Sequence, residues 1–121
     1  MKKVIYILPL FFLFISFSSL QAQEKKKKKN VITTEFSVRG NCGMCGDRIE
    51  NAALIKGVKR AEWDSDKEMI VVVYREDKVS EEAIHKAIAE KGHETSKAKA
   101  NEKAYNGLAK CCQYKTEKCD N

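Results

Sequence analysis

Residues 40–50 read Gly-Asn-Cys-Gly-Met-Cys-Gly-Asp-Arg-Ile-Glu and lie between two regular patterns. Before them, residues 31–38 alternate apolar and polar side chains, which predicts a strand with one buried face. After them, residues 45–56 place apolar side chains at helical spacing, and Gly57 follows where a helix C-cap is expected. The stretch therefore predicts a strand, a tight loop and a helix, in that order.

The rest of the predicted fold follows from patterns of the same kind. Residues 58–64 and 69–74 have the character of two further strands, joined by a polar turn. Ser80 is suited to cap a second helix that ends at Gly92, and residues 93–98 are typical of a weaker edge strand. The order is β-α-β-β-α-β, an α+β arrangement of the ferredoxin-like type. It implies that two helices cover one face of a four-stranded antiparallel sheet.

Cys42 and Cys45 are well placed for metal chemistry. The predicted loop holds Cys42, and the first turn of the helix holds Cys45. The N–H groups and the positive dipole end of a helix start stabilise a thiolate, so we expect a lowered pKa at Cys45. Two thiolates at this spacing can turn toward one ion. Soft thiolates select Cu(I), Zn(II) and similar ions, and the same softness favours Hg(II).

The loop also resembles the metal-binding loop of the heavy-metal-associated domain family. In that family a Cys-x-x-Cys pair is followed by Ile-Glu, at the offset at which Ile49 and Glu50 follow Cys45 here. The similarity covers residues 31–97. It includes several separate positions, namely Gly57-Val58, Ala61, Val71, Val73-Tyr74, Ala87-Ile88 and Gly92-His93.

Members of this family include copper chaperones, the N-terminal domains of copper ATPases and the periplasmic mercury-binding protein. The resemblance implies that the chain is a metallochaperone and not an enzyme. It would capture a soft metal ion through Cys42 and Cys45, most readily Cu(I), with Hg(II) or Zn(II) as alternatives. It would then transfer the ion by ligand exchange to a metal-transporting membrane protein or another metal-binding protein.

The sequence departs from the family pattern at two places. Gly40-Asn41 stands where the family has Met-Thr, so the Met that packs beneath the loop is missing. His93 occupies a position from which family members approach the metal. As a third ligand it would favour three-coordinate Cu(I) or Zn(II); the alternative is a solvent-exposed histidine.

Cys111 and Cys112 form a second candidate group. They are adjacent, which suits neither a direct disulfide nor the grip of one ion by this pair alone. They are candidates to add ligands to the first cysteine pair, to form a second site with Cys119, or to bridge to the loop. The alternative is a pair of buried or oxidised thiols with no metal role.

Composition and the family resemblance together predict four parts of the chain. A basic start, an apolar run and a small residue at Ala22 predict a cleaved secretory signal peptide, and hence a periplasmic or secreted protein; an uncleaved membrane anchor is the alternative. In the tail, Tyr105 and Leu108 are spaced to dock it onto the preceding domain. The parts are the signal peptide (1–22), a basic linker (23–30), the heavy-metal-associated domain (31–98) and a Cys-containing C-terminal tail (99–121).

The charge distribution excludes one class of partner. Residues 31–121 contain equal numbers of basic and acidic residues, so the predicted domain and tail have no net basic charge for nucleic acid. The lysine run 25–29 is interpreted as a solvated linker. We therefore expect no nucleic-acid binding, and no stable membrane insertion once the signal is cleaved.

A periplasmic thiol–disulfide redox protein is the main rival, because Cys-Gly-x-Cys also occurs in thioredoxin-like enzymes. Those enzymes have an aromatic residue before the first cysteine and a cis-proline opposite it. Here Asn41 precedes the pair, and the only proline is Pro9, inside the predicted signal.

A metal-free interaction module ranks lower, because it leaves the cysteine pair unexplained. Hydrolytic chemistry has no support, and we expect His85 on the solvated face of the second helix.

Overall fold

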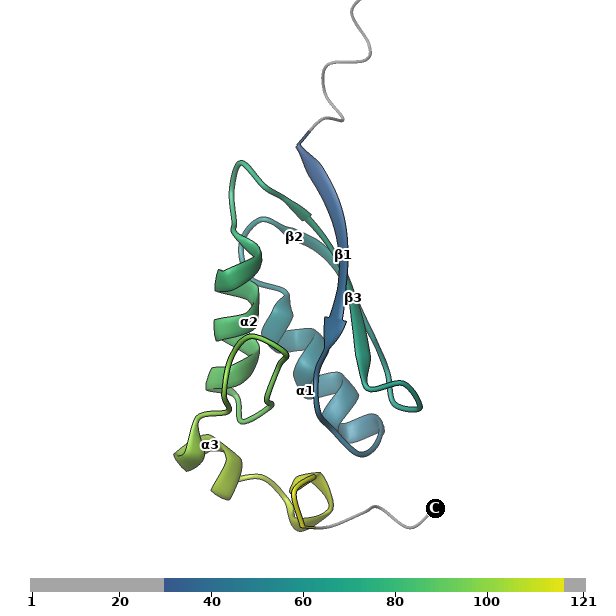
Figure 1. Ribbon diagram of the computed structural model, residues 1–121, viewed down its shortest axis with the longest axis vertical. Coiled ribbons are helices and arrows are strands. Elements are labelled where there is room, and N and C mark those ends of the chain that lie inside the picture. Colours follow the sequence, from purple (N-terminus) through teal and green to yellow (C-terminus); the bar gives the residue numbers. More distant parts are fainter. Residues whose placement is uncertain (1–29, 117–121) are drawn as a thin grey trace, which may run out of the picture.

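The computed structural model describes residues 30–116. The predicted signal peptide (1–22), all but the last residue of the predicted linker, and Cys119 lie outside this part of the chain. Figure 1 shows the elements in order: β1 (Val31–Ser37), α1 (Gly43–Ala53), β2 (Val58–Asp64), β3 (Met69–Arg75), α2 (Glu81–Glu90), α3 (Glu102–Asn106) and the short 3-10 turn η2 (Lys110–Cys112).

The described strands form an antiparallel sheet in the order β1-β3-β2. Ile70 of the central strand is opposite Phe36 of β1 on one side and Trp63 of β2 on the other. Alternate residues of β3 are buried, beginning with Ile70, whereas those between them are only partly covered. The expected hydrophobic pattern therefore sets the register and directs one face of the sheet into the core.

Helices α1 and α2 supply the other side of this core. Helix α1 contacts both β2 and α2. Ile49 of α1 and Ile84 and Ile88 of α2 have no exposed surface. The predicted cap of α2 is present, because the Ser80 hydroxyl accepts a hydrogen bond of 3.2 Å from the Ala83 N–H. No helix within residues 30–116 combines the length and apolar character that crossing a bilayer requires.

The prediction of a fourth strand at residues 93–98 is wrong for the described structure. Pairing is limited to an isolated bridge between Thr95 and Val38, in which the Ser96 N–H donates to the Ser37 carbonyl and the Arg39 N–H donates to the Glu94 carbonyl. The reason is a tight local turn. The Thr95 hydroxyl accepts hydrogen bonds from the N–H groups of Lys97 and Ala98, and the Thr95 N–H donates to the Ala98 carbonyl. These bonds close a turn over residues 95–98, so the pairing with β1 does not continue beyond Ser96.

The prediction for His85 is also wrong, because this side chain is almost fully buried. Its ring lies against Phe36, with 3.8 Å between the ring centroids. Its Nδ1 is 2.6 Å from the Thr95 hydroxyl, and its Nε2 is 3.3 Å from a Glu81 carboxylate oxygen. The turn at Thr95 thus covers the face of α2 that the helical pattern assigned to solvent.

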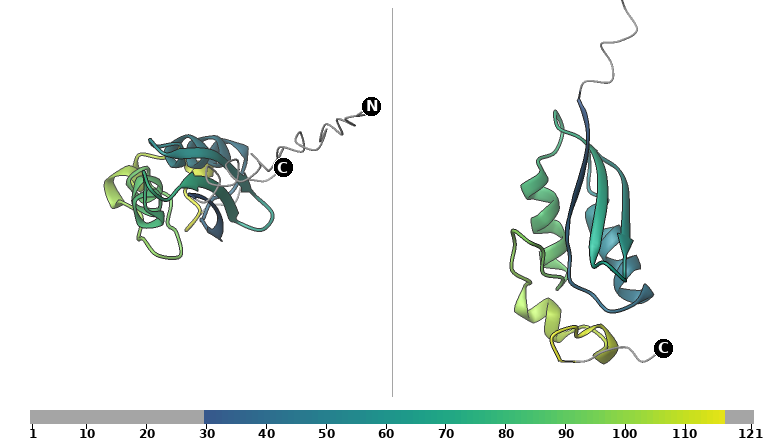
Figure 2. Two further views of the ribbon diagram at one scale, coloured as in Figure 1. Left: turned by 90° about the horizontal axis from the view of Figure 1, so that it is seen from above. Right: turned by 45° about the vertical axis from the view of Figure 1, so that its right-hand side comes forward.

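The C-terminal segment, defined here as residues 102–116, packs onto the same core. Tyr105 and Leu108 are both buried in it, as expected, and so are Cys112 and Tyr114. In Figure 1 this segment crosses the end of the fold where β1 leads into α1. The right-hand view of Figure 2 shows it below the lower ends of α1 and α2. The segment therefore lies beside the cysteine loop.

Candidate metal centre

The cysteine loop ends in the first turn of α1. Cys42 is the N-cap, with an extended backbone at φ −151°, and α1 begins at Gly43. The first turn closes when the Gly46 N–H donates a 3.0 Å hydrogen bond to the Cys42 carbonyl. Cys45 lies in this turn and is fully buried, whereas Cys42 is only partly buried. The pair therefore has one inner sulfur and one that is reachable from outside.

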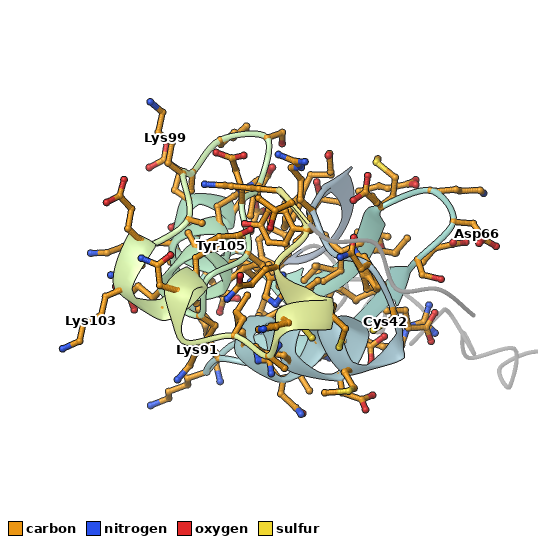
Figure 3. The ribbon with its side chains drawn as sticks, turned by 90° about the horizontal axis from the view of Figure 1, so that it is seen from below. Cys42, Asp66, Lys91, Lys99, Lys103 and Tyr105 are labelled. Carbon is orange, nitrogen blue, oxygen red and sulfur yellow. The ribbon has the colours of Figure 1, made fainter. Side chains whose placement is uncertain are left out.

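A third sulfur joins this pair from the C-terminal segment. The Sγ atoms of Cys42, Cys45 and Cys112 all lie within 4.8 Å of one another. Figure 3 looks at this end of the molecule and shows Cys42 beside the pale yellow turn η2, which carries Cys112. Cys112 has no exposed surface. The fold thus brings together three thiol groups from two distant parts of the chain.

The electrostatics of Cys45 differ from the expectation of a lowered pKa. Burial raises the pKa of the Cys45 thiol to about 11, and the nearby Cys112 thiol adds to the rise. Main-chain hydrogen bonds at Asn41 and Cys42 lower this pKa but do not offset burial. The expected lowering is therefore wrong, because desolvation outweighs the hydrogen bonds of the loop main chain. A metal ion must displace the Cys45 proton when it binds.

Trp63 supports the loop from beneath. Its ring nitrogen donates a 3.0 Å hydrogen bond to the Val38 carbonyl. A Cβ atom added at Gly40 would lie 2.9 Å from the indole ring, and one at Gly46 would lie 3.1 Å from it. The loop is thus in close contact with a large rigid side chain, although the family Met is missing. The sequence pattern placed Trp63 on a strand but gave no sign of this role.

Glu50 explains part of the Ile-Glu pattern that follows the cysteines. Its carboxylate accepts a 2.9 Å hydrogen bond from the main-chain N–H of Trp63. Helix α1 is thereby tied to β2 at the residue that also supports the loop. Ile49, the other residue of the pattern, has no exposed surface and fills the core. The two residues therefore fix the helix that carries Cys45.

His93 is buried rather than solvent-exposed, and it does not belong to the sulfur cluster. Its Nδ1 is 2.9 Å from the Arg39 carbonyl, so Nδ1 donates, and its ring stacks on Tyr114 at 5.6 Å between centroids. Its Nε2 is buried with no hydrogen-bond partner among the described residues. Burial lowers the pKa of His93, and the positive charge of Arg48 lowers it further. That charge also opposes a cation at Nε2.

Cys111 lies next to the cluster but outside it. Its Sγ is 4.0 Å from that of Cys112, and its side chain is partly buried. The Cys111 carbonyl accepts a 2.9 Å hydrogen bond from the Asn41 side-chain amide. Of the two adjacent cysteines, the structure therefore brings Cys112 to the first pair, and Cys111 contacts the loop through its main chain.

The two buried histidines predict a pH-dependent stability. Burial lowers the pKa of both His85 and His93 in the folded protein, so the unfolded chain binds protons more readily. We expect the free energy of unfolding to fall as the pH drops below about 6.5, by up to about 1.4 kcal/mol per pH unit for each histidine. Urea denaturation at several pH values measures this. A His85→Gln variant should show a shallower slope, and an equal slope would contradict the assignment.

Several solved structures share this fold. The CopZ metallochaperone is 27% identical, with a TM-score of 0.51 over 53% of this chain and 98% of that chain. Oxidized MerP from Ralstonia metallidurans CH34 is 26% identical, with a TM-score of 0.52 over 55% of this chain and 94% of that one. The N-terminal domain of a potential copper-translocating P-type ATPase from Bacillus subtilis, in its Cu(I)-loaded state, is 27% identical, with a TM-score of 0.51 over 54% and 84%.

No protein-family model matches the sequence, and no curated protein is significantly similar to it. The structural neighbours are matched over most of their own length, whereas nearly half of this chain has no counterpart in them. The likeness is therefore to a whole small domain, to which this chain adds further residues.

Proposed function

We propose that this protein is a metallochaperone. It resembles the heavy-metal-associated domain family in its fold as well as in its cysteine loop. It captures a soft metal ion, Cu(I) foremost and Hg(II) or Zn(II) as alternatives, through the thiolates of Cys42 and Cys45. The observation that carries this proposal is that the Sγ atoms of Cys42 and Cys45 lie close together at the start of α1. A copper-loaded ATPase domain and a metallochaperone among the structural neighbours support it.

The unequal burial of the two cysteines suits transfer by ligand exchange. Cys42 is the outer sulfur and Cys45 the inner one. A thiolate of a partner can add to the ion on the Cys42 side and displace that ligand first. The ion then leaves Cys45 in a second exchange. No bond to the ion need break before another has formed, so the ion passes between proteins without being released into water.

The partner in this proposal is a metal-transporting membrane protein or another metal-binding protein, and the site of action is the periplasm or the exterior of the cell. The predicted signal peptide is the basis for this location. The neighbouring ATPase domain supports a partner of the transporting kind. No catalytic role is assigned to any residue.

A thiol–disulfide redox enzyme remains the second candidate, but no observation favours it. The neighbours are metal-binding domains and a metallochaperone, and no cis peptide bond occurs within residues 30–116.

A metal competition experiment tests the proposal. The reduced, metal-free protein is titrated with Cu(I) under anaerobic conditions against a chromophoric Cu(I) chelator. Separate titrations with Zn(II) and Hg(II) are run in parallel. We expect one Cu(I) per chain, taken from the chelator and returned to it when chelator is added in excess. The same preparation should fail to accelerate insulin reduction by dithiothreitol. A protein that leaves Cu(I) with the chelator, or that accelerates insulin reduction, contradicts the proposal.

A further inference from the structure

We propose that the C-terminal segment supplies a third metal ligand, Cys112, so that the site is a closed three-sulfur centre. This inference rests on the proposed function and makes it more specific. The sequence places Cys112 far from the Cys-x-x-Cys pair, and the structural neighbours cover only about half of this chain. The three sulfurs and the contacts that hold the segment in place carry the inference.

The spacing of the sulfurs suits one ion. With metal–sulfur bonds of about 2.3 Å, three sulfurs around a trigonal ion lie about 4.0 Å apart. The Sγ atoms of Cys42, Cys45 and Cys112 are already within 4.8 Å of one another without an ion. A contraction of less than about 1 Å therefore completes the site. Backbone rearrangement is not needed for a change of this size.

The segment is held in a single position by hydrogen bonds to the main domain. The Tyr114 hydroxyl donates to the Gly92 carbonyl at 2.8 Å and accepts from the Glu94 N–H at 2.9 Å. Its ring also lies under the Arg39 guanidinium, 5.0 Å from the ring centroid. Tyr114 is two residues beyond Cys112, so these bonds fix where η2 places its sulfur.

The loop and the segment are also joined directly beside the sulfurs. Asn41 precedes Cys42, and its side chain binds the carbonyl of Cys111, which precedes Cys112. This bond aligns the two halves of the site one residue away from the sulfurs. Asn41 occupies one of the two positions at which the loop departs from the family pattern. The departure thus accompanies a contact to the C-terminal segment.

Three sulfurs select among soft ions. Zn(II) takes four ligands in closed sites, and no histidine, aspartate or glutamate of residues 30–116 joins this group. Cu(I) and Hg(II) accept three thiolates, and the burial of Cys45 and Cys112 keeps water from taking a ligand position. The closed site is thus suited to Cu(I) or Hg(II) over Zn(II). A partner thiolate can still add on the side of the partly buried Cys42, and release is complete when the C-terminal segment undocks and Cys112 gives up the ion.

X-ray absorption spectroscopy of the Cu(I)-loaded full chain tests the inference. We expect three sulfur neighbours in the wild type and two in Cys112→Ser. The affinity of Cys112→Ser in the chelator competition should fall by about tenfold or more. Cys111→Ser is the matched control, because Cys111 is adjacent in sequence but outside the cluster, and it should behave as the wild type.

The outcomes separate this inference from the proposed function. Two sulfurs in the wild type, with unchanged affinity in Cys112→Ser, overturn the third ligand and leave the metallochaperone intact. Cu(I) binding of unchanged affinity in the double variant Cys42→Ser/Cys45→Ser overturns the proposed function itself. The wild-type spectrum does not depend on the folding of any variant. Circular dichroism of metal-free Cys112→Ser shows whether its loss of affinity reflects a lost ligand or a lost fold.

Discussion

Replacing Cys45 by serine is expected to lower the affinity for Cu(I) by about a thousandfold or more. Cys45 has no exposed surface and lies in the first turn of α1. A serine hydroxyl is a hard donor that Cu(I) binds poorly, and the remaining sulfurs then hold the ion from the loop and the C-terminal segment alone. Competition against a chromophoric Cu(I) chelator at fixed pH measures the change.

Met44 offers a matched control within the same loop. It lies between the two cysteines and is 52% exposed, so Met44→Leu should leave both the affinity and the fold unchanged. The buried hydroxyl of Cys45→Ser is expected to cost about 1–3 kcal/mol of stability, so folding of this variant must be verified by circular dichroism. A change in affinity of less than tenfold in folded Cys45→Ser would show that the ion is held elsewhere.

Replacing Gly92 by alanine is expected to destabilise the protein by about 2–4 kcal/mol and to undock the C-terminal segment. Gly92 ends the turn after α2 with φ at +97°, a conformation that L-residues rarely adopt. A Cβ atom there would lie 2.9 Å from the main-chain nitrogen of Tyr105. The helix α3 backbone would have to move. Urea denaturation measures the loss, and hydrogen exchange in residues 105–115 reports the undocking.

Gly43→Ala is the corresponding control, because a Cβ atom at Gly43 meets nothing within 4 Å. Gly43 is the first residue of α1, where alanine is accepted. The stability of the Gly43→Ala protein should therefore stay the same or rise slightly. If the two variants lose stability equally, the close approach of α3 to Gly92 does not hold the segment. Cu(I)-loaded Gly92→Ala should also show fewer sulfur neighbours than the wild type.

Local sequence patterns predict much of this fold. The alternation in β1, the apolar run of β3 and the Ser80 cap of α2 each depend on residues close in sequence, and each is present. The position of Cys45 at a helix start follows from the same kind of signal. These features are predictable because secondary structure reflects a periodicity that neighbouring residues determine.

The remaining features depend on contacts between distant residues. The Thr95 hydroxyl forms hydrogen bonds within a local turn, so the chain does not extend the sheet there. That turn also buries His85. The pKa of Cys45 is governed by burial, which no helix-start pattern reports. Cys112 is held at the loop by the hydrogen bonds of the Tyr114 hydroxyl to Gly92 and Glu94. None of these contacts has a periodic signature in the sequence.

The position of Cys112 has a consequence for the resistance of the protein to proteolysis. An ion held by the loop and by η2 would act as a removable cross-link across about 70 residues of chain, which in a disulfide stabilises by about 4 kcal/mol. Loading would then tighten the fold, and delivery would loosen it at the C-terminal segment. Proteases cut loosened segments first. Resistance to proteolysis would therefore distinguish molecules that carry cargo from those that have delivered it.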